Sequence, residues 1–149
     1  MVYPAEAIAG SIINWSHKLD LKITNFRLSK LLYFVQAEYI RRFGSRLIDE
    51  DFVCWQYGPA IPSVYYKYCV AASLPLPKQP LTIEIEDQAQ VCILYVLARS
   101  AEMKMFDLVG ISQSQDPWKY NTLIFGKGSN IPYKCMEEFF LCSKDVFAI

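Results

Sequence analysis

The side chains that most often carry catalysis are sparse in this sequence. His17 is the only histidine, so a Ser or Cys nucleophile has just one imidazole available as its base. We expect His17 near the end of the first helix, where a surface cation is favourable. Glu137 and Glu138 are adjacent on an expected helix, where neighbouring side chains point apart. We therefore predict no catalytic residue and no enzymatic activity.

The cysteines do not form a recognisable metal site. They are Cys54, Cys69, Cys92, Cys135 and Cys142, an odd number in which no two make a C-x-x-C pair. With one histidine in the chain, a structural zinc would need four well-spaced cysteine ligands. We expect reduced thiols, no metal and no cofactor.

Lys30 lies in the most demanding surroundings of any charged residue. The second expected helix begins after Thr24 or Asn25 as its N-cap and stops at Gly44. One of its faces carries Leu28, Leu31, Leu32, Val35, Tyr39 and Phe43, and the other carries Phe26, Tyr33, Ala37 and Ile40 around Lys30. Such a helix is either the central member of a bundle or packed on one face and offered to a partner on the other. A lysine there must reach solvent, pair with a carboxylate of residues 49–51, or meet a partner.

An aromatic turn comes after this helix. Trp55, Tyr57, Gly58 and Pro59 form a rigid corner, and Trp and Tyr dominate interface energies when a partner desolvates them. The alternative interpretation is a corner packed on the second helix. The partner-binding hypothesis covers Phe26, Lys30, Tyr33, Trp55, Tyr57, Gly58, Pro59 and Tyr65.

The expected elements are mostly helices. The first helix starts near Pro4, the third opens at Pro62, the fourth is capped by Asp87, a short one covers residues 106–111, and the last comes after residues 131–132. Residues 52–57 and 81–85 alternate like strands and are expected to pair. Residues 112–118 are interpreted as a polar segment that separates two elements, and residues 126–130 as a flexible loop. The sequence predicts a mainly α fold, a compact bundle of five to six helices with a small two-stranded β ribbon, in one domain spanning residues 1–149.

Composition narrows the class of protein. Of the 149 residues, 53% are apolar and 15% aromatic, which is too apolar for a disordered chain. No apolar run approaches the roughly 20 residues that span a bilayer, and no secretory signal is visible, so we expect a cytoplasmic protein. Zero net charge argues against a nucleic-acid partner. The seven basic residues between positions 18 and 46 leave a helix-turn-helix regulator open as an alternative.

Three ordered motifs resemble the Panacea-type (SocA-like) antitoxin family. Residues 24–36, TNFRLSKLLYFVQ, are similar to its opening helix, T-N-x-x-L-x-K-L-L-Y-F-x-Q. Residues 47–59 are similar to its L-F-D-E-x-x-x-A-W-x-Y-G-P, with Cys54 in place of Ala. Residues 108–118 are similar to its L-x-x-x-T-H-x-x-x-P-W, with Gln113 where many members have His. The structural motif residues are Leu31, Leu32, Pro62, Pro117 and Trp118.

The resemblance implies an antitoxin of a toxin–antitoxin system that neutralises a toxin encoded nearby, often within a prophage, by direct protein–protein binding. The implied assembly is a complex with the toxin, with a homodimer or a heterotetramer as possible forms. Two alternatives stay open: an adaptor that delivers the toxin to a protease, and a nucleic-acid-binding regulator. No membrane partner is expected.

Overall fold

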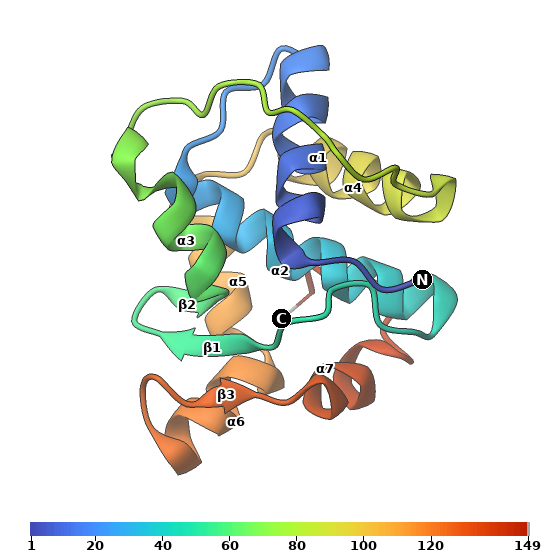
Figure 1. The fold of residues 1–149 in the computed structure, drawn as a ribbon. Coiled ribbons are helices and arrows are strands. Elements are labelled where there is room, and N and C mark those ends of the chain that lie inside the picture. The colour runs from blue at the N-terminus through green and yellow to red at the C-terminus, as the bar shows by residue number, and fades with distance from the viewer. Residues whose placement is uncertain (149) are drawn as a thin grey trace.

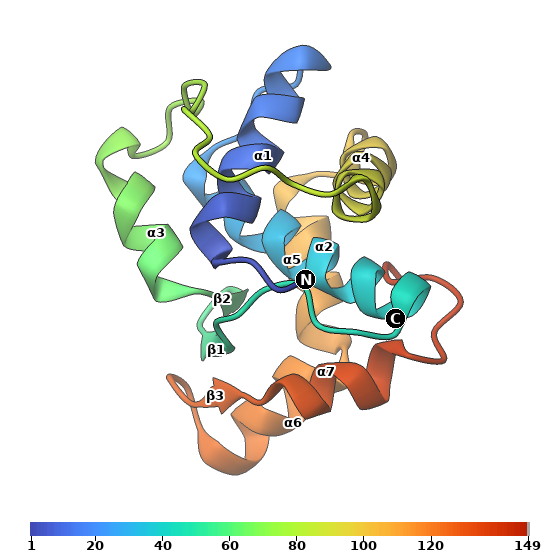
Figure 2. The ribbon, with the colours of Figure 1, turned by 45° about the vertical axis from the view of Figure 1, so that its right-hand side comes forward.

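A central helix, α2 (Asn25–Phe43), organises the chain, of which the computed structural model describes residues 1–148. Five other helices contact it: α1 (Ala5–Lys18), α3 (Pro62–Tyr68), α4 (Asp87–Ser100), α5 (Met105–Ser114) and α7 (Tyr133–Phe140). Two views at different angles place α3 and α4 on either side of α1, with α6 and α7 at the far end (Figure 1, Figure 2). Residues 28–40 are all buried, so α2 is the central member of the bundle and uses both apolar faces internally.

Local chemistry fixes both ends of α2. The hydroxyl of Thr24 accepts a hydrogen bond from the backbone N–H of Arg27 at 3.2 Å, which satisfies one free donor of the first turn. At the other end Gly44 adopts the left-handed conformation, with φ 65°. Arg41 donates two hydrogen bonds to the buried carboxylate of Glu38, at 2.9 and 2.6 Å, and Arg42 also bonds to it. The last turn of α2 is therefore capped, and the buried Glu38 carboxylate is paired with two arginines.

A small antiparallel sheet lies beside α2. Its central strand β1 (Phe52–Trp55) pairs with β2 (Gly58–Ala60) through a two-residue turn, and with β3 (Asn130–Ile131) on the other side. The mainly α fold class is confirmed. Of the expected strand at residues 52–57, residues 52–55 form β1 and residues 56–57 form the turn to β2, and the sheet has three strands where two were expected.

The expected partner strand does not. Residues 81–85 form no strand, and they belong to an extended connector, residues 72–86, that passes over α1 from α3 to α4 (Figure 1). Asn14 on α1 exchanges two hydrogen bonds of 2.7 Å with the backbone of Gln79. Hydrogen bonds from the Asn14 side chain, and not pairing with a strand, thus hold the connector. Leu81 and Ile83 stay exposed and only Ile85 is buried, so the alternating pattern did not mark a sheet.

Seven α-helices and a short 3-10 helix η1 (Cys69–Ala71) are present within residues 1–148, where five to six helices were expected. The additional helix is α6 (Asp116–Phe125), which begins inside the polar segment, residues 112–118, that was expected to separate two elements. Pro117 lies in its first turn, where its missing N–H costs nothing. Part of the expected flexible loop forms β3. None of the helices in the described part of the chain has the length and apolar content to cross a membrane.

Candidate partner-binding site

A cavity of about 490 Å³ opens beside the first turns of α2. Three segments that are distant in the sequence line it: Phe26, Ser29 and Lys30 from α2; Trp55, Gln56, Tyr57 and Ala60 from the β1–β2 hairpin; and Tyr65 and Tyr66 from α3. This volume is typical of sites that enclose a ligand or a few side chains. The structure thus brings five of the eight hypothesised residues, Phe26, Lys30, Trp55, Tyr57 and Tyr65, to one cavity.

The hairpin is fixed by a glycine that no other residue can replace without strain. Gly58 has φ 109°, and a Cβ atom there would lie 2.6 Å from Oγ of Ser112 and 3.4 Å from the Lys30 side chain. From α5, the Gln113 side chain donates to the carbonyl of Gln56 at 2.8 Å. Gln113 thus supports the turn through its amide, a role that does not need an imidazole.

Lys30 forms the base of the cavity, and no carboxylate of residues 1–148 pairs with it. Its side chain is buried, with the residue only 2% exposed, and its Nζ donates to the carbonyl oxygen of Pro59 at 3.0 Å. Burial lowers the pKa of Lys30 to about 7. The Phe26 ring lies 5.7 Å away and offers a weak cation–π contact. No salt bridge to Lys30 forms within residues 1–148.

The suggested carboxylate at residues 49–51 does not reach Lys30. Asp51 accepts instead from Arg46 at 2.7 Å, and Glu50 accepts from the backbone N–H of Ala5 at 2.8 Å. These contacts hold the N-terminus and the segment before β1 in place. Of the three alternatives for Lys30, pairing with a carboxylate of residues 49–51 is therefore not seen, and the backbone carbonyl of Pro59 accepts from its ammonium instead.

Aromatic rings form the walls. Phe26 and Tyr57 meet edge to face at 5.5 Å between centroids, and Trp55 meets Tyr65 and Tyr66 at 5.2 and 5.8 Å. Trp55 is also anchored from α6, because the Trp118 indole donates to its carbonyl at 3.0 Å. Tyr57 is 49% exposed and Tyr66 is 64% exposed. The walls are held by neighbouring rings but remain open to a partner.

Three hypothesised residues point elsewhere. Tyr33 is fully buried in the core, where its hydroxyl donates to Oε1 of Gln115 at 3.0 Å. Burial, and then the charge of Asp116, raise the pKa of Tyr33 well above its usual value. Gly58 and Pro59 are buried and do not line the cavity, but the Pro59 carbonyl accepts a hydrogen bond from Lys30 at its base. The additional lining residues are Ser29, Gln56, Ala60 and Tyr66, of which only Tyr66 carried a signal in the sequence, as an aromatic residue beside Tyr65.

The structural motif residues behave as framework. Leu31 and Leu32 are fully buried on α2, and Pro62 begins α3. Pro117 is buried in the first turn of α6, next to the anchoring Trp118. They position the elements around the cavity without lining it.

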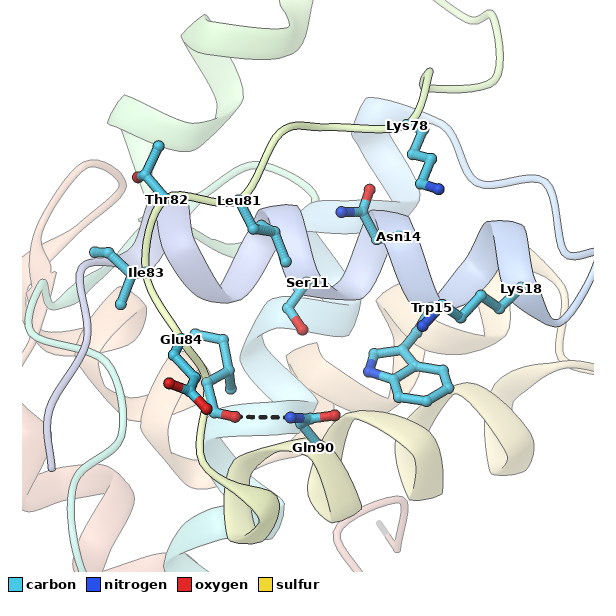
Figure 3. Close-up of a pocket in the computed structure, with 11 residues that line it drawn as sticks. Ser11, Asn14, Trp15, Lys18, Lys78, Leu81, Thr82, Ile83, Glu84 and Gln90 are labelled. Atoms are coloured by element: carbon cyan, nitrogen blue, oxygen red, sulfur yellow. Dashed lines mark hydrogen bonds between the residues drawn. The ribbon is translucent and has the colours of Figure 1, made fainter.

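A second cavity of about 500 Å³ lies between α1, the connector and α4 (Figure 3). Its charged side chains are Lys18, Lys78 and Glu84, which are all exposed and of both signs. Lys18 lies over the Trp15 ring at 4.5 Å, and Gln90 donates to the backbone of Ile85 at 2.7 Å. Because its charges are hydrated, this cavity lacks the buried, unpaired group that distinguishes the Lys30 cavity.

Metal-ligating side chains do not cluster: residues 1–148 hold no group of three or more His, Cys, Asp or Glu residues that could bind a metal ion. The imidazole of His17 lies 2.8 Å from the carbonyl oxygen of Leu76 and helps to hold the connector. The distinctive chemistry of the described chain is thus a buried lysine among aromatic rings.

Comparison with known proteins defines the class. Residues 28–119, more than half of the chain, match the family described as Antitoxin SocA-like, Panacea domain, and the chain belongs to that family. All the cavity residues except Phe26 lie inside this matched stretch. The resemblance found in the sequence motifs is thereby confirmed.

One relative is a specific antitoxin. The chain is 35% identical over 71 residues to Antitoxin SocA of Caulobacter vibrioides (strain NA1000 / CB15N). That stretch makes up 48% of this chain and 37% of the relative, so the match spans little more than a third of the relative's length. No solved structure matches the chain.

Proposed function

We propose that this chain is an antitoxin that neutralises a cognate toxin encoded nearby by binding it directly, without catalysis of its own, and that the Lys30 cavity lies at the contact. The observation that carries this proposal is the convergence of Phe26, Lys30, Trp55, Tyr57 and Tyr65 on one open cavity. We further propose that residues 1–149 act as one Panacea-type domain.

The cavity has the physical properties of a binding surface. Tyr and Trp side chains present large apolar areas at low entropic cost, and they are common anchors of protein interfaces. Edge-to-face contacts hold one side of the Tyr57 and Tyr66 rings, which lowers the side-chain entropy lost on binding. A partner that covers these rings would bury apolar surface on a preformed site.

Co-expression with the neighbouring gene tests the proposal. Growth rescue, the toxin's steady-state amount and the dissociation constant of the complex are measured for wild type, Tyr57→Ala and Tyr120→Ala. Tyr120 on α6 is a matched control, because it is 47% exposed and lies outside the cavity. We expect Tyr57→Ala to weaken binding at least tenfold, as an interface anchor does, and Tyr120→Ala to bind like wild type.

Each outcome has a definite meaning. If wild type does not rescue growth, the antitoxin function is wrong. If Tyr57→Ala folds, binds and rescues like wild type, the cavity is not at the interface. Toxin that disappears in the presence of the antitoxin, and reappears when the host protease is deleted, would favour the adaptor mechanism over occlusion.

A further inference from the structure

Helix α2 carries two buried ionisable side chains, and within residues 1–148 only one of them has partners of opposite charge. Glu38 is fully buried, and two arginines balance its carboxylate. Lys30 lies eight positions earlier on the same helix, about 12 Å along its axis, too far for Glu38 to act as its partner. A buried ion without a counter-ion is costly, so an occupant of the cavity that brings a negative charge would lower this cost.

The cavity above Lys30 offers hydrogen-bond donors and no negative charge. None of its nine lining residues is acidic. The ammonium group has three N–H donors, and Pro59 accepts from one of them. Within residues 1–148, the hydroxyls of Tyr57, Tyr65 and Tyr66 make no hydrogen bond to protein. A group that enters the cavity therefore meets the Lys30 amine and the side chains of three tyrosines and a tryptophan.

We propose that the cavity receives an acidic side chain of the toxin, an Asp or Glu next to an apolar residue, whose carboxylate becomes the counter-ion of Lys30. This inference rests on the proposed function. The carboxylate oxygens accept from the free N–H groups of Lys30 and from the tyrosine hydroxyls, and the apolar neighbour packs on Trp55 and Tyr57. Charge-assisted hydrogen bonds of this kind are about twice as strong as neutral ones.

The energetics favour binding because one of the two ions is already dehydrated. Pairing two hydrated ions in a dry interface normally requires both to lose water. Lys30 has already lost most of its hydration in the folded chain. Of the two groups, only the partner's carboxylate has to be dehydrated. Because burial lowers the pKa of Lys30 to about 7, the fraction of Lys30 that is neutral near pH 7 takes up a proton from solvent as the ion pair forms.

A peptide experiment tests the cavity independently of the toxin. The probes are two capped tripeptides, Leu-Glu-Phe and Leu-Gln-Phe, titrated into the full isotope-labelled chain and monitored by NMR. Wild type, Lys30→Met and the exposed-lysine control Lys127→Met are compared. We expect wild type and the control to bind the Glu peptide at least tenfold more tightly than the Gln peptide, with shifts at Tyr57 and Tyr65. In Lys30→Met the preference should fall to about one.

Equal affinity of wild type for the two peptides, absence of binding by the Glu peptide, or a preference that survives Lys30→Met would each overturn the inference. A second experiment uses the toxin itself. Lys30→Glu is tested for rescue against a library in which each Asp or Glu of the toxin is changed singly to Lys. We expect Lys30→Glu to lose rescue, and one charge-reversed toxin that is still lethal alone to be neutralised by it.

If Lys30→Glu does not fold, Lys30→Met takes its place in a double-mutant cycle with toxin variants that carry Glu→Gln or Asp→Asn changes. One such toxin change should weaken binding to wild type at least tenfold and leave binding to Lys30→Met unchanged. If wild type rescues but no toxin variant shows this coupling, the carboxylate inference is wrong while the antitoxin function stands. If wild type fails to rescue, the function falls, and the peptide titration still reports on the cavity.

Discussion

Replacing Lys30 by Met measures how strongly the folded chain disfavours the buried ammonium. The pKa of Lys30 falls from 10.5 to about 7 on folding. Between these two values the unfolded chain binds one proton more than the folded chain, so the free energy of unfolding must rise with pH. Methionine keeps the apolar stem and does not titrate, so its variant should lack this rise.

The fall in the pKa of Lys30 sets how much the free energy of unfolding rises with pH. One pKa unit corresponds to about 1.4 kcal/mol, and between pH 6 and pH 9 the wild-type chain should gain roughly 3 kcal/mol in unfolding free energy relative to Lys30→Met. Urea unfolding at four pH values in this range measures the difference. Subtracting the two curves removes the contributions of groups that both chains share.

The matched control is Lys127→Met, which changes an exposed lysine in a loop. Its curve should run parallel to that of wild type at every pH. Parallel curves for Lys30→Met as well would refute the burial argument, because they would mean that the ammonium is hydrated in the folded chain. A fall in the relative stability of wild type with rising pH would mean that Lys30 has an anionic partner after all.

Three further changes have definite expected outcomes. Gly58→Ala should lower the unfolding free energy by about 2–4 kcal/mol, because alanine is strained at the positive φ and its Cβ would clash with Ser112. Urea unfolding in a Ser112→Ala background should recover only the part of this loss that comes from the clash. Cys92 should resist an aromatic disulfide reagent at pH 8 until the chain unfolds, while the exposed Cys69 reacts at once, because burial and then a nearby carboxylate raise the pKa of Cys92 to about 12; simultaneous labelling would contradict this. Tyr33→Phe should cost about 1–2 kcal/mol in thermal unfolding, because it leaves a buried amide oxygen without its donor, and an unchanged stability would show that water replaces the hydroxyl.

Much of the helical framework could be predicted from the sequence, because the signals are local. Thr24, Gly44 and Pro62 act within one turn of their own helices, and the predicted boundaries agree with the structure. The predicted cap of α4 is wrong, because Asp87 is its first helical residue, Glu86 occupies the N-cap position, and no side chain of residues 1–148 caps this end. The missed helix, α6, begins at Asp116 and Pro117, a pair that equally favours a turn or a helix start. The residues after this pair must decide between the two, and the exposed apolar residues at the end of α6 gave no clear helical face.

Sheet pairing could not be predicted in the same way, because a strand needs a partner that local pattern does not identify. β1 takes its neighbours from residues 58–60 and 130–131, so residues 81–85 are left without one. The residue types on α2 and the hairpin indicated a binding surface. That these residues meet in one cavity depends on tertiary packing, which the local sequence does not encode. Tyr33 shares a helical face with Phe26 and Lys30, but it lies one turn further along α2, where its hydroxyl bonds to the buried Gln115, a difference that periodicity does not reveal.

The enclosure of α2 also affects how quickly the chain folds. Phe34 stacks on Phe147 at 4.6 Å and Tyr33 meets Phe140 at 5.8 Å, pairs that are separated by more than a hundred residues in the sequence. Helical proteins whose helices touch only their sequence neighbours fold rapidly, because the loops they close are short. This chain must close long loops before its central helix is covered, and the entropy lost in doing so raises the folding barrier. Its kinetics should therefore resemble those of mixed α/β domains more than those of simple helical bundles.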